Sequence, residues 1–87
     1  MKVAIWDTYV PRKDGRTMHF DIVVPEHVQH EKIVHSFGQE YLFTKDQVGQ
    51  PLTSKQCQFC HTEIASEEME WNIAQKGYYI IEMEGCE

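Results

Sequence analysis

The Asp14-Gly15 pair constrains the fold more than any other feature of the sequence. Asp-Gly is a strong signal for a tight hairpin turn, because glycine readily adopts the positive φ that such turns need. The two flanking segments, residues 2–10 and 17–24, are rich in β-branched and aromatic residues. Each segment ends at a proline, Pro11 or Pro25. The sequence therefore predicts two antiparallel strands joined by a hairpin.

The second strand of this hairpin carries polar groups on one face. His19 and Asp21 project from the same side, because side chains two residues apart on a strand point the same way. An aspartate beside a histidine can orient it for acid–base chemistry or for metal binding. Asp7 falls on an otherwise apolar face of the first strand and could add a carboxylate nearby. The competing explanation is a solvated polar face with a surface ion pair.

Two helices and a last strand are expected after the hairpin. In residues 26–42, Ile33, Phe37 and Tyr41 recur every four positions, which is typical of a helix. Residues 44–52 are polar and predict a loop, and residues 53–56 resemble a capping box that would begin a short helical turn entering Cys57. Residues 66–77 have an N-cap serine, early acids and a terminal glycine, which predicts a second helix. Residues 78–84 alternate as a strand does.

These elements predict one α+β domain over residues 1–87, with the order ββααβ. The last strand joins the hairpin in a small antiparallel sheet, because a lone hairpin is only marginally stable. Both helices are expected to pack on one face of that sheet.

The chain also resembles a bacterial family. The resemblance extends over nearly the whole chain and rests on these segments: residues 7–10, 14–15, 18–21, 57–61 and 77–86. By these motifs the chain is identified as a member of the domain-of-unknown-function family DUF2024. The resemblance implies a compact domain with helices and antiparallel strands, and it implies no activity.

Charge and hydropathy exclude some classes of function. Fourteen acidic residues against eight basic ones leave a net charge of -6, which disfavours a nucleic-acid partner. No segment approaches the roughly 20 apolar residues of a membrane span, so no membrane association is expected. Met1 begins no export signal, which predicts a cytoplasmic protein. Exposed sheet edges allow a homodimer, although no interface can be identified.

Cys57-Gln58-Phe59-Cys60-His61 is the sharpest motif in the chain. It matches the C-x-x-C-H signature of haem attachment, but haem is disfavoured because it is attached outside the cytosol. Two cysteines at this spacing are also half of many zinc sites. The candidate zinc ligands are Cys57, Cys60 and Cys86, with His19 and His61 as possible fourth ligands.

Two other roles for these cysteines remain open. Cys57 and Cys60 could cycle between dithiol and disulfide, or the cysteines could simply pack as small hydrophobic residues. The first functional hypothesis is therefore a binding or regulatory module whose cysteine segment is structural or binds zinc. The alternative is a small thiol-dependent oxidoreductase that uses Cys57 and Cys60.

Overall fold

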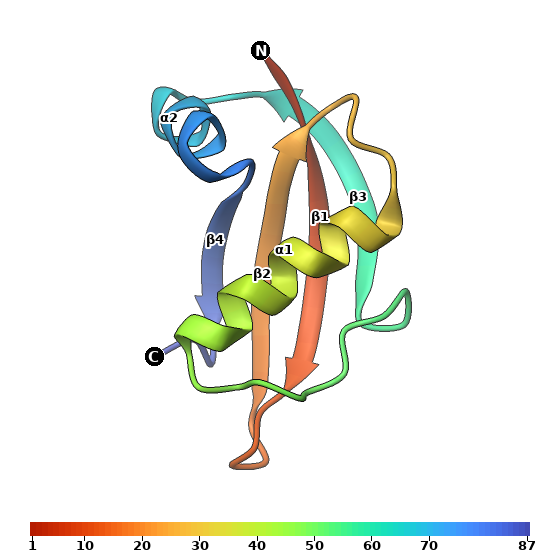
Figure 1. Cartoon of the computed structure of the whole chain (residues 1–87), viewed down its shortest axis with the longest axis vertical. Helices are drawn as coiled ribbons and strands as arrows, with labels where there is room; N and C mark the ends of the chain where they lie inside the picture. The colour runs from red at the N-terminus through yellow and green to blue at the C-terminus, as the bar shows by residue number, and fades with distance from the viewer.

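The computed structural model describes all 87 residues and has an α+β fold (Figure 1). In chain order, its elements are β1 (Lys2–Pro11), β2 (Thr17–Pro25), α1 (Glu31–Thr44), β3 (Cys57–Ile64), α2 (Glu67–Lys76) and β4 (Tyr79–Glu84). The strands form one antiparallel sheet in the order β3-β1-β2-β4. The predicted hairpin is confirmed and forms the centre of this sheet. No helix is long and apolar enough to cross a membrane.

The predicted order ββααβ is wrong, because the chain runs ββαβαβ. The segment that begins at Cys57 is a strand paired with β1, and the predicted helical turn is confined to the residues before it. There Gln56 Oε1 accepts a hydrogen bond from the backbone N–H of Thr53, as a capping box requires. The turn ends after these residues because the open edge of β1 takes up the next eight residues as β3.

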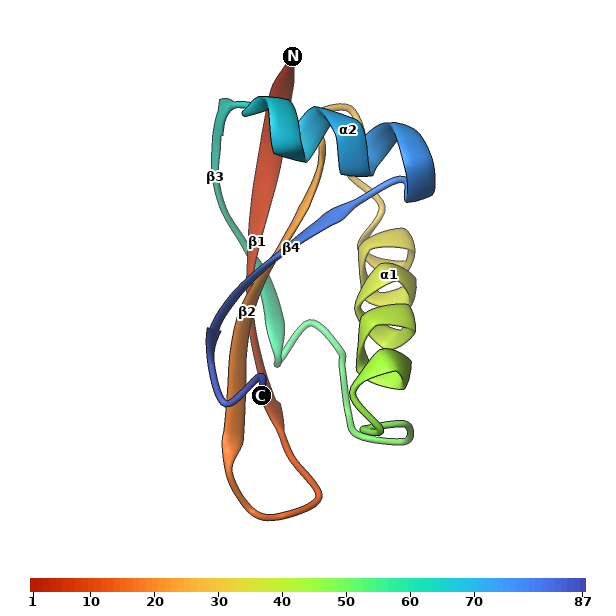
Figure 2. The ribbon, with the colours of Figure 1, turned by 90° about the vertical axis from the view of Figure 1, so that its left-hand side faces the viewer.

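The expectation that both helices cover one face of the sheet is also wrong. The α1 face holds the larger core, in which Trp6, Phe20 and Ile22 pack with Leu42. The opposite face holds a smaller core of Val3, Ile5, Val23 and Ile73, the last of which belongs to α2. Figure 2 shows α1 beside the sheet and α2 crossing its end. The crossing follows from topology, since α2 joins strands at opposite edges of the sheet.

Capping interactions set both ends of α2, and a turn after β2 sets the start of α1. The second helix is confirmed: Ser66 Oγ accepts from the backbone N–H of Met69 at 3.1 Å, and Gly77 ends the helix in the left-handed conformation with φ of 93°. The first helix begins later than predicted, at Glu31, because the chain first makes a turn after Pro25.

Replacing Gly77 by alanine is expected to lower the free energy of unfolding by about 1–2 kcal/mol. An L-residue in the left-handed region is strained by about that amount, and the new Cβ would lie 3.1 Å from Phe37 Cζ. Urea unfolding measures the change. Gly49→Ala is the matched control, because Gly49 has φ of +91° but open space around its Cα. An equal loss in both variants would show that Phe37 contributes nothing to the effect.

Candidate functional site

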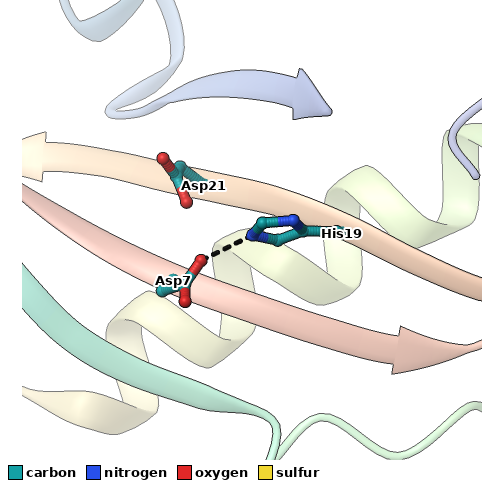
Figure 3. Close-up of side chains that lie close together, drawn as sticks. All are labelled: Asp7, His19 and Asp21. Atoms are coloured by element: carbon teal, nitrogen blue, oxygen red, sulfur yellow. Dashed lines mark hydrogen bonds and ion pairs between the residues drawn. The ribbon is translucent and has the colours of Figure 1, made fainter. Parts of the chain in front are cut away.

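Three polar side chains converge on the face of the sheet opposite α1. Asp7 on β1 and Asp21 on β2 lie directly opposite each other, and His19 lies two residues from Asp21 on the same face. One ligand atom from each of the three side chains lies within 4.8 Å of those from the other two. Figure 3 shows the three side chains together on the two central strands. No other group of three or more histidine, cysteine, aspartate or glutamate side chains meets this criterion.

The orientation of the His19 ring is set by two contacts with the neighbouring strand. His19 Nε2–H donates a hydrogen bond to Asp7 Oδ1 at 2.7 Å. The Tyr9 ring stacks on the imidazole, with centroids 4.1 Å apart and an interplanar angle of 13°. Both contacts follow from the hairpin register, which pairs Tyr9 with His19. The imidazole is therefore held with Nε2 toward the carboxylates.

The cluster is electrostatically unfavourable when both aspartates are ionised, because like charges directly opposite on neighbouring strands repel. Burial, then the hydrogen bond and the negative charge of Asp7, raise the pKa of Asp21 to about 6. Desolvation, followed by the charges of Asp7, Asp21 and Glu84, raises the pKa of the Tyr9 phenol. The site therefore favours the binding of positive charge, whether a proton or a metal cation.

The cluster is accessible to a small ion. Ile73 of α2 packs over Val3, Ile5 and Val23 at the other end of this face, and the polar cluster lies beyond them. Asp21 is buried, with 8% of its surface exposed, whereas the side chains of His19 and Asp7 are 22% and 38% exposed. The site is thus a partly open surface centre with one buried carboxylate beneath it.

Cys57 and Cys60 are separated by the strand that carries them. Cys57 is buried in the core, and Cys60 is exposed at an irregularity where Trp6 pairs with Phe59 but Ile5 pairs with His61. Three residues of extended chain span about 10 Å. A disulfide needs Cα atoms within roughly 7 Å, so an intact β3 brings these two thiols neither into a disulfide nor onto one ion.

The remaining cysteine lies at the other edge of the sheet. Cys86 follows β4, whereas Cys57 begins β3, and two strands separate those edges, which corresponds to about 14 Å. Cys86 is buried and its Sγ–H donates to the carbonyls of Glu84 and His19, at 3.3 and 3.5 Å. The structure therefore does not gather the three cysteines around one point.

His61 also lies apart from the cluster. Its Nδ1 is 3.3 Å from Cys60 Sγ and its Nε2 is 3.7 Å from Glu63 Oε1, all on the exposed face of β3. Of the five sequence-predicted metal ligands, His19 alone joins a compact cluster. Strand alternation predicts that His19 and Asp21 share a face with Asp7 nearby, but the predicted ligand set does not include the two aspartates.

Thiol reactivity should separate the three cysteines. We expect one thiol of the native protein to react quickly with Ellman's reagent and all three to react after unfolding, because only Cys60 is exposed. Burial raises the pKa of the Cys57 thiol, which slows its reaction further. Cys60→Ser should remove the fast phase, and Cys86→Ser should leave it unchanged. More than one fast thiol in the native protein would contradict the burial of Cys57 or Cys86.

Comparison with known proteins places the chain in one family. The model of the family described as Domain of unknown function (DUF2024) matches residues 1–83. The NMR structure of protein NE1680 from Nitrosomonas europaea is similar, with 40% sequence identity, complete coverage of both chains and a TM-score of 0.86. Among curated proteins, none matches. Because the family model matches residues 1–83, the chain belongs to the DUF2024 family.

Proposed function

We propose that this protein is a small binding module with a divalent-cation site formed by Asp7, His19 and Asp21. The observation that carries the proposal is the convergence of one imidazole and two carboxylates, from the two central strands, within 4.8 Å. Zinc binds histidine nitrogen and carboxylate oxygen. An imidazole ligand favours zinc or another transition metal over magnesium or calcium, which prefer oxygen ligands throughout. Zn²⁺ is therefore the cation to test first.

The energetics of the cluster support a cation. Two aspartates facing each other lower the stability of the folded chain, and a divalent ion between them would remove their repulsion. Binding would displace the proton that His19 Nε2 shares with Asp7, because a histidine nitrogen ligates a metal only when deprotonated. The Tyr9 stack would keep the imidazole in place during this exchange.

In this proposal the cysteine segment is structural. Cys57 packs in the core, where a cysteine behaves as a small hydrophobic residue. The thiol-dependent oxidoreductase is the alternative, because Cys60 is exposed next to His61. It requires a Cys57–Cys60 disulfide and therefore local distortion of β3. A Cys57→Ser variant that reduces a test disulfide as well as the wild type would exclude it.

Calorimetric titration tests the cation site. Protein purified without a metal-chelating tag and treated with EDTA should bind one Zn²⁺ per chain, and His19→Ala should weaken this binding by about 100-fold or more. His27→Ala is the matched control, because His27 is exposed in the turn after β2 and far from the cluster in the sheet. If His19→Ala binds as tightly as the wild type, the proposal fails. Loss of binding in Cys60→Ser or His61→Ala instead would assign the ion to the cysteine segment.

A further inference from the structure

A concave site separate from the polar cluster lies on the α1 face of the sheet, at the corner formed by β1 and β3. It is a pocket of about 430 Å³, with Ala4 and Trp6 of β1 and Phe59 of β3 among its lining residues. Glu26 and Val28, from the segment between β2 and α1, also line it. Trp6 and Asp7 are consecutive on one strand, so this pocket and the polar cluster lie on opposite faces of the sheet.

Backbone hydrogen bonds hold in place the strands and the segment after β2 that line the pocket. The register places Trp6 beside Phe59, and their rings meet edge to face with centroids 5.8 Å apart. Figure 1 shows the segment after β2 swinging across β1 and β3 before α1 begins. Two backbone bonds hold that segment: the Glu26 N–H donates to the Lys2 carbonyl at 3.1 Å, and the Val28 N–H donates to the Pro25 carbonyl at 2.9 Å. The pocket is therefore formed before any ligand arrives.

The lining of the pocket is mostly apolar, with Gln29 and Thr62 as neutral polar residues and Glu26 as the acidic one. Glu26 is the only charged residue that lines it, and Glu26 takes part in none of the ion pairs of the chain. Trp6 is 7% exposed, and its Nε1–H has no hydrogen-bond acceptor within the protein. Phe59, in contrast, is 53% exposed although it is a large aromatic residue. The Trp6 N–H is buried and offers nothing to a ligand, so the pocket presents the exposed Phe59 ring beside one acidic residue.

We propose that this pocket binds a small organic amine. Its protonated amino group would pair with Glu26, and its aromatic or aliphatic body would lie against Trp6 and Phe59, since aromatic rings attract cations as well as apolar groups. The volume falls within the roughly 300–1,000 Å³ of small-molecule sites. A carboxylate ligand of the same shape is disfavoured by Glu26 and by the net charge of -6.

Titration with 2-phenylethylamine, followed by NMR amide shifts and by tryptophan fluorescence, tests the proposal. The fluorescence variant is Trp71→Phe, which leaves Trp6 as the only tryptophan and changes an exposed residue of α2. We expect a Kd of about 1 mM for a ligand of this size. The anion 3-phenylpropionate, which has the same aromatic body, should bind about tenfold or more weakly.

Two variants make the test specific. Glu26→Gln should weaken the amine about tenfold while leaving the neutral analogue 2-phenylethanol unchanged. Glu31→Gln, an exposed position at the start of α1, should change neither ligand. The proposal is overturned by any of three results: no saturable response up to about 10 mM amine, equal binding of the amine and the carboxylate, or an unchanged amine affinity in Glu26→Gln. EDTA-treated protein is used throughout, so these results do not depend on the cation site.

Discussion

Replacing Asp21 by asparagine is expected to weaken Zn²⁺ binding by about 100-fold or more and to stabilise the metal-free protein at pH 7.5. The two effects have one cause, because Asp21 faces Asp7 directly across the hairpin. An asparagine removes one metal-ligating carboxylate and the repulsion between two like charges. Its side-chain amide can donate a hydrogen bond to Asp7, as the protonated form of Asp21 does. A gain in stability with a loss of binding is the pattern expected of a functional site.

The gain in stability should depend on pH. Burial and Asp7 raise the pKa of Asp21 to about 6 in the folded protein, above the ordinary value of 3.8. Folding therefore favours the protonated carboxyl, and the stability of the wild type falls as the pH rises from about 4 to about 6. At pH values above the raised pKa of about 6, Asp21 is ionised and the wild type carries the full loss of stability. After a discount for solvent screening near the half-exposed Asp7, we expect Asp21→Asn to gain about 1–2 kcal/mol at pH 7.5.

Urea unfolding at pH 7.5 and pH 4, with EDTA present, measures this difference, and the gain should largely disappear at pH 4. Glu63→Gln is the matched control, because Glu63 is an exposed acid of β3 outside the cluster. A destabilised Asp21→Asn at pH 7.5 would mean that the two carboxylates do not repel each other in the folded state.

Phe20→Ala is expected to remove much of the stability of the fold, about 3–5 kcal/mol. Phe20 is fully buried on the α1 face of β2, and its ring lies 4.7 Å from that of Tyr41 between centroids. Truncation would leave a cavity between the central hairpin and the first helix. A domain of this length has only about 4–13 kcal/mol of total stability, and its melting temperature should fall by more than about 12 °C.

Thermal unfolding followed by circular dichroism measures this change. Phe43→Ala is the matched control, because Phe43 lies on α1 and is 71% exposed. The control should change stability by less than about 0.5 kcal/mol. A small loss in Phe20→Ala would show that α1 is not anchored through this side chain.

The hairpin was predictable because its signals are local. These signals are the glycine of the turn, the prolines that end the strands and the alternation of side chains along β2. Each acts within a few residues, and the structure confirms the two strands and the positive φ of Gly15. The second helix was predictable for the same reason, since Ser66 and Gly77 supply its two ends. The first helix was predicted in part, because its apolar repeat starts only at Ile33 and so does not define the first residue of the helix, and the turn after Pro25 delays that start to Glu31.

The third strand was not predictable from its own residues. In β3 every residue after Cys57 is exposed, so the segment lacks the alternation that marks a half-buried strand. It becomes a strand because β1 offers a free edge of hydrogen-bonding groups. That pairing separates Cys57 from Cys60 and places Cys86 at the far edge, so the spacing of the cysteines did not indicate their distances in space.

The amino-acid sequence by itself determined the hairpin, the second helix, the family and the shared face of His19 and Asp21, because each depends on neighbours in the chain. Only the tertiary structure decided that Asp7 faces Asp21, that α2 crosses the end of the sheet with Ile73 on the face opposite α1, and that Trp6 and Phe59 line one pocket. These contacts depend on the register and order of strands that are distant in sequence. The register and order of the strands depend on many weak contacts between different strands, so they cannot be predicted from any one segment alone.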